Sequence, residues 1–113
     1  MHLHSDLTDL VQLALAAPSD ETLTAEAVRK TMDAFAALHP GRSVEVRVPP
    51  YRVVQVLGGT THRRGTPPAV VEMPPATWLE LIVGQVTWPM AVSAGKIQAS
   101  GVGSDLTEIF SDN

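Results

Sequence analysis

The densest run of positive charge in this sequence is His62-Arg63-Arg64, which lies between Gly59 and Gly65. Guanidinium groups are planar, forked donors, so Arg63 and Arg64 are candidates to contact a phosphate, a carboxylate or the head group of an acyl-CoA. The competing interpretation is a solvated hairpin tip, because loops are polar by default. The glycines form no phosphate-binding loop, since none begins the Gly-Lys-Ser/Thr run that would open a helix.

Glu72 is the one acid in an unusual setting, because it lies near the end of a predicted strand among apolar residues. If its side chain points inward, burial favours its neutral form unless Arg47, Arg52 or Arg64 pairs with it. If it points outward, it belongs to a cross-strand ion pair on the wet face of a sheet. The sequence leaves both interpretations open.

Other groups that perform catalysis are missing or badly spaced. The chain has no cysteine, which excludes disulfides, thiolate zinc sites and cysteine nucleophiles. No serine lies in a Gly-x-Ser-x-Gly frame. His39 and His62 are too far apart to pair by spacing, and His2 and His4 near the terminus suit only adventitious metal binding. We therefore expect no catalytic residue, no functional metal, no cofactor and no enzymatic activity.

Eight large apolar residues are candidates to line a cavity for an apolar ligand, because methionines and aromatic rings adapt to irregular apolar shapes: Met32, Phe35, Trp78, Leu81, Ile82, Trp88, Met90 and Phe110. The competing interpretation is an ordinary core, since a domain of 113 residues needs all its apolar side chains. Trp78 and Trp88 each need an acceptor for the indole N–H, or must keep that edge in water.

The composition is that of one globular domain. Hydrophobic residues make up 44% of the chain and charged ones 18%, which excludes disorder over its whole length. A formal charge of −4, from 12 acidic and 8 basic residues, leaves no basic stripe for nucleic acid and disfavours stable attachment to anionic lipid. Because neither a signal peptide nor an apolar run of about 20 residues is recognisable, we expect a cytoplasmic protein.

Two helices are expected first. Apolar residues at i, i+3, i+4 and i+7 from Leu7 predict a helix that Ser5 caps and Pro18 stops. After a short polar turn, Thr24 is predicted to cap a second helix, which ends at Pro40-Gly41.

The apolar period then changes from 3.6 to 2, which indicates strands. The pattern predicts three strands, two short helices, a fourth strand and a terminal helix, in the order 44–48, 51–57, 69–73, 76–83, 88–94, 96–100 and onward from 104 or 105. Three consecutive strands suggest an antiparallel meander, and the whole order predicts an α+β domain with helices packed on a sheet. We divide this single compact domain into an N-terminal helix and turn, 1–22, and a main part, 23–113.

A spaced set of residues in the second half of the chain is characteristic. It comprises Thr77-Trp78-Leu79, Gly84, Ala91, Gly95-Lys96-Ile97 and Gly101. This set resembles the C-terminal half of the sterol carrier protein superfamily. The loop 64–68, Arg-Gly-Thr-Pro-Pro, and the Val-Val-Glu strand at 70–72 are similar to small stand-alone bacterial orthologues. The resemblance covers about residues 25–110.

The resemblance implies a largely antiparallel five-stranded sheet with helices packed on one face. It also implies an apolar tunnel between sheet and helices for a lipid, fatty acyl or sterol-like ligand. We therefore expect a non-enzymatic binding or carrier domain, with the terminal helix as a movable lid and Arg63 and Arg64 at any polar head. The alternatives are a ligand-free interaction module, such as a homodimer, and an accessory subunit of an enzyme, because fold alone does not settle the ligand.

Overall fold

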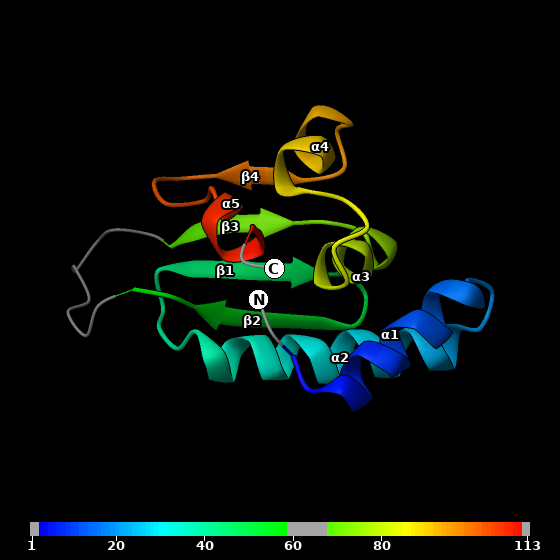
Figure 1. The fold of residues 1–113 in the computed structure, drawn as a ribbon. Helices are drawn as coiled ribbons and strands as arrows, with labels where there is room; N and C mark the ends of the chain where they lie inside the picture. The colour runs from blue at the N-terminus through cyan, green and yellow to red at the C-terminus, as the bar shows by residue number, and fades with distance from the viewer. Residues whose placement is uncertain (1–2, 59–67, 112–113) are drawn as a thin grey trace.

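The computed structural model describes residues 3–58 and 68–111, which form helices on one side of a small sheet (Figure 1). The elements, in chain order, are α1 (Ser5–Ala16), α2 (Glu21–Leu38), β1 (Val44–Val48), β2 (Arg52–Val56), β3 (Ala69–Glu72), α3 (Pro75–Ile82), α4 (Trp88–Ser93), β4 (Gln98–Ser100) and α5 (Thr107–Phe110). None of the described helices is long and apolar enough to cross a membrane.

The sheet has the strand order β2-β1-β3-β4. β1 pairs antiparallel with β2 and parallel with β3, and β3 pairs antiparallel with β4. The predicted meander of three consecutive strands is therefore wrong, because β3 pairs with the far edge of β1 instead of with β2. The connection between β2 and β3, residues 57–68, is longer than a two-residue hairpin loop, and β2 and β3 lie on opposite sides of β1. Two of the three pairings are antiparallel, and the predicted α+β class is confirmed.

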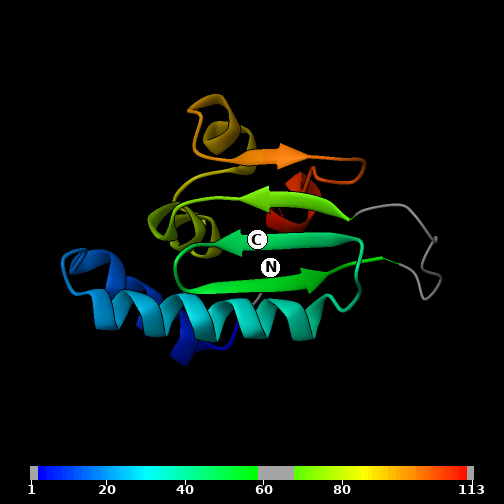
Figure 2. The ribbon, with the colours of Figure 1, turned by 180° about the vertical axis from the view of Figure 1, so that it is seen from behind.

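The alternation in β1 separates two faces of the sheet. Val44, Val46 and Val48 are buried on the helix side, whereas Glu45 and Arg47 lie on the other side. The register carries this division to the neighbouring strands, since residues paired across strands share a face. Figure 2 shows that none of the described helices covers the second face. The predicted packing of helices on one face is thus confirmed.

The second helix starts one turn earlier than the sequence predicts. The carboxylate of Asp20 accepts a hydrogen bond from the Leu23 amide at 3.0 Å, and α2 begins at Glu21. Thr24 therefore lies inside the helix, and its predicted capping role is wrong. Aspartate is at least as good an N-cap as threonine, so the earlier of two available caps sets the start.

The C-terminal elements are shorter than predicted. The fourth strand is Gln98–Ser100, and the terminal helix begins only at Thr107. In between, the Asp105 carboxylate accepts hydrogen bonds from both the amide and the hydroxyl of Thr107. This local turn replaces the first helical residues that the sequence suggested, because a short acidic side chain competes well for nearby backbone donors.

Helix α1 packs against α2 and α3. Its Val11 and Ala14 side chains are buried in the same hydrophobic core as the residues of the sheet and of the later helices. The amide of Asp6 donates to the His4 ring at 3.3 Å, so His4 occupies the capping position that the sequence assigned to Ser5.

Candidate functional site

Four aromatic side chains from four different helices meet on the helix-covered side of the sheet. They are Phe35 of α2, Trp78 of α3, Trp88 of α4 and Phe110 of α5, and all four are buried. We call them the aromatic cluster. Each helix contributes one ring, so the cluster depends on the arrangement of all four helices at once.

Phe110 stacks nearly parallel with two other rings. Its ring centre is 5.6 Å from that of Phe35 and 5.7 Å from that of Trp88, with interplanar angles of 9° and 10°. Trp78 meets Phe35 and Phe110 edge-on, at 5.2 and 5.9 Å. Offset stacks and edge-to-face contacts are the favourable geometries for aromatic pairs. Phe110 thus packs against the other three rings at once, and we call the position that its ring occupies the slot.

The indole of Trp78 is fixed from behind by a hydrogen bond. Its Nε1 donates to the hydroxyl oxygen of Thr31 at 2.9 Å, and that hydroxyl donates to the carbonyl oxygen of Ala27 at 2.7 Å. Thr31 is completely buried. Thr31 is not among the candidate residues predicted from the sequence, although it lies four positions after Ala27 and four before Phe35, on the apolar stripe of its helix. A threonine inside such a stripe was the available signal.

The remaining predicted cavity residues divide into two groups. Met32, Leu81 and Ile82 are buried in the core that contains the aromatic cluster. Met90, on α4, is 57% exposed. The structure thus brings seven of the eight residues into one buried core and places Met90 at the surface.

Only some of the residues predicted to make polar contacts lie in the described part of the chain. Arg63 and Arg64, with His62, lie outside the described residues. Glu72 lies on the uncovered face of the sheet, opposite Arg47 in register. Arg47, however, pairs with Glu45. Within residues 3–58 and 68–111, Glu72 forms no ion pair with Arg47 or Arg52. The same residues contain no cluster of three potential metal ligands.

Helix α5, which carries Phe110, is held by apolar packing against the core and by hydrogen bonds in the turn that precedes it. Leu106 and Phe110 are buried, and Ile109 packs partly against the core. At its start, hydrogen bonds from the Thr107 hydroxyl and then from the Thr107 amide hold the pKa of Asp105 below its usual value of 3.8. The N-cap residue itself, Leu106, makes no side-chain capping bond.

The chemistry of the cluster is that of an apolar site. The Trp78 indole N–H already donates to the Thr31 hydroxyl, which in turn donates to the Ala27 carbonyl, so a ligand in the cluster would find rings and aliphatic groups. Helices cover one face of the sheet and enclose this cluster, which is the arrangement that the resemblance to sterol carrier proteins implies.

The comparison with protein families agrees with this fold. The family model described as "Bacterial SCP ortholog" matches residues 20–111. The chain therefore belongs to this family, which confirms the resemblance seen in the sequence. Helix α1 precedes the matched region, although its side chains enter the same core. No curated protein is detectably similar to this chain.

Proposed function

We propose that this chain is a non-enzymatic binding or carrier domain for a small apolar ligand of lipid, fatty acyl or sterol-like character. The stacking of Phe110 on both Phe35 and Trp88 carries the proposal. In the closed form, Phe110 occupies the slot. When α5 moves away, Phe35, Trp88 and Trp78 become the walls of an apolar site.

Helix α5 is suited to be the moving part. It has only four residues, Thr107–Phe110, and a helix this short has no stability of its own. Its position thus depends on docking, chiefly through Leu106 and Phe110. Trp78, in contrast, is tied to α2 by its hydrogen bond to Thr31. The walls of the site would stay in place while the lid leaves.

The free-energy cost of displacing α5 favours ligands with long apolar parts. Exposing the buried side chains of Phe110 and Leu106 costs about 3–6 kcal/mol in total. Each buried methylene returns about 0.8 kcal/mol, so roughly four to eight methylenes are needed before binding becomes favourable. A long acyl chain or a sterol meets this requirement, and a two-carbon acid does not. Arg63 and Arg64 remain the proposed contacts for a polar head.

Native mass spectrometry of protein purified without detergent tests the proposal, with palmitate and cholesterol as added probes. We expect a one-to-one adduct of a few hundred daltons. In Phe110→Ala the slot is empty, so palmitate should bind about tenfold more tightly, because the displacement of one ring is no longer required. Val71→Ala, which shortens a buried side chain of the sheet instead, is the matched control and should leave palmitate affinity unchanged.

An unmodified mass after incubation with both lipids, for the wild type and for Phe110→Ala, would exclude the carrier function. The second candidate would then be a ligand-free interaction module, acting as a homodimer or as an accessory subunit. One observation favours it: Val53 pairs in register with Arg47, so it lies on the uncovered face of the sheet, and it is 53% exposed. The same spectrum distinguishes a monomer from a dimer.

A further inference from the structure

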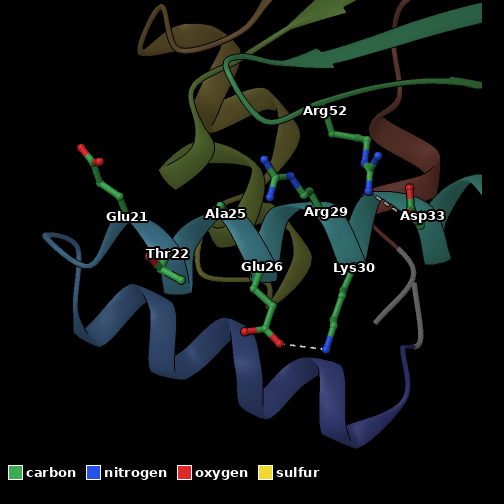
Figure 3. A pocket seen from close by; sticks show the side chains of 8 residues that line it. All are labelled: Glu21, Thr22, Ala25, Glu26, Arg29, Lys30, Asp33 and Arg52. Atoms are coloured by element: carbon green, nitrogen blue, oxygen red, sulfur yellow. Dashed lines mark hydrogen bonds and ion pairs between the residues drawn. The ribbon is translucent and has the colours of Figure 1, made fainter.

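A charged hollow of about 540 Å³ lies along the exposed side of α2, away from the aromatic cluster (Figure 3). Its lining comes from α2 and from the first residue of β2: Glu21, Thr22, Ala25, Glu26, Arg29, Lys30, Asp33 and Arg52. None of these residues belongs to the aromatic cluster. Figure 3 shows Arg29 and Arg52 on one side of α2, and Glu26 and Lys30 on the other.

Arg29 is held in place without a carboxylate. Its Nε donates to the carbonyl oxygen of Tyr51 at 3.5 Å, and its guanidinium carbon lies 5.9 Å from the centre of the Tyr51 ring. Among the residues that the structure describes, no acid forms an ion pair with Arg29. The terminal nitrogens of this guanidinium are therefore available to a ligand.

Arg52 is only partly satisfied. One terminal nitrogen donates to the carboxylate of Asp33 at 3.0 Å. Its Nε is buried and has no acceptor in the described part of the chain, and a buried N–H without a partner is unfavourable. The second terminal nitrogen of Arg52 makes no hydrogen bond to the described residues, so it is the donor that Arg52 offers to a ligand in the hollow.

The charges around these arginines favour an anion. Glu26 is engaged by Lys30 at 2.8 Å, and Asp33 by Arg52. The remaining acid, Glu21, lies eight residues before Arg29 on α2, which corresponds to about 12 Å along the helix axis. Among the basic residues that line the hollow, Arg29 is thus the one whose positive charge has no paired carboxylate close by.

We propose that Arg29 and Arg52 bind the anionic group of a small molecule, a carboxylate or a phosphate. Two guanidinium groups offer paired N–H donors to the paired oxygens of such a group. Asp33 competes with the ligand for Arg52. This site does not depend on the apolar ligand proposed above, because it uses other residues on another surface.

The proposal is tested by titrating inorganic phosphate, and separately acetate, into the full chain while the arginine side-chain N–H signals are followed by NMR. We expect saturable shifts at Arg29 and Arg52. Arg29→Met keeps the aliphatic stem and should weaken binding about tenfold, since it removes a charge-assisted contact. Asp33→Asn should tighten binding severalfold, because Arg52 is released from its carboxylate.

Lys96→Met is the matched control. It removes one positive charge from an exposed position that does not line the hollow, so binding should change by less than about twofold. Thermal midpoints verify that each variant folds. The proposal is overturned if no shift saturates, if Lys96→Met weakens binding as much as Arg29→Met, or if Asp33→Asn brings no gain.

A comparison of hexanoate with acetate then identifies the source of the anion. Tighter binding of hexanoate indicates an acyl ligand whose chain adds contact, whereas equal affinity indicates a free small anion. Because palmitate binding at the aromatic cluster is read from Phe110→Ala, failure of one proposal is distinguishable from failure of the other.

Discussion

At the scale of single residues, the most informative contact is the hydrogen bond between Trp78 and Thr31. A buried indole N–H must find an acceptor, and the sequence gives two tryptophans that face this requirement. The partner lies 47 positions away in the chain. Local patterns therefore predict the need for an acceptor, whereas only the packing of α2 against α3 identifies it.

Replacing Thr31 by valine should destabilise the fold by about 1–3 kcal/mol, because the Trp78 N–H is then buried without an acceptor. Valine has nearly the same shape as threonine, so packing is preserved. Urea denaturation of the wild type and of Thr31→Val measures the effect. Thr22→Val, at an exposed position of the same helix, should change the free energy of unfolding by less than about 0.5 kcal/mol.

The double variant separates the hydrogen bond from packing. If the bond is the cause, Thr31→Val in a Trp78→Phe background should cost much less than in the wild type, since no donor is left unpaired. Equal costs in both backgrounds would mean that Thr31 acts through packing alone.

At the scale of elements, the start of α2 differs from the prediction. The sequence pattern predicts Thr24 as the cap, whereas the structure uses Asp20. The consequence reaches the surface: Glu21 and Thr22, which the sequence places in a turn, become helical residues that line the charged hollow.

Alanine at these two positions should affect the free energy of unfolding differently. Asp20→Ala removes the cap of α2 and should lower the free energy of unfolding by about 1 kcal/mol. Thr24→Ala places a better helix former inside the helix and should be neutral or slightly stabilising. Thermal unfolding of both variants tests this, and a larger loss for Thr24→Ala would restore the start expected from the sequence.

The turn before α5 should make the docking of this helix sensitive to acid. The pKa of Asp105 is lowered by its hydrogen bonds to Thr107, so its ionised form is favoured in the folded state. The resulting stabilisation is present above the unfolded value of 3.8 and is lost as the pH falls through the lower folded value. We expect the NMR signals of Ile109 and Phe110 to shift in that range.

The comparison of two amide variants assigns this transition. Asp105→Asn should remove the shift, whereas Glu108→Gln, on the same short helix, should leave it in place. A transition that persists in Asp105→Asn would show that another carboxyl group controls the docking of α5.

At the scale of the whole molecule, the sequence predicts more of the parts than of their arrangement. The valine alternation of β1 and the stripe of α2 report burial directly, so these elements and the α+β class follow from local periodicity. The spacing of the glycines after Thr77 also indicates the family to which the chain belongs. The order of strands does not follow, because β1 pairs as well with β3 as with β2 and nothing local chooses between them.

For the candidate site, too, the sequence predicts which residues are buried but not how they are arranged. Residue type and stripe position bring Phe35, Trp78, Trp88 and Phe110 into one core, but the contact of Phe110 with the other three rings requires four helices to be placed together. Met90 illustrates the limit: a large apolar residue on a short helix is a core candidate by type, yet its side of α4 faces water. The charged hollow depends on a contact between Asp33 and Arg52, 19 positions apart.

The composition of the aromatic cluster has an optical consequence. The chain contains two tryptophans, and both have their rings against Phe110. The tryptophan emission of this protein therefore originates beside Phe110, from one indole stacked on its ring and one in edge-on contact with it. Withdrawal of Phe110 without a ligand in its place would admit water to both indoles and move their emission to longer wavelength, whereas an apolar ligand in its place would not, so emission distinguishes an empty open site from a filled one without a label.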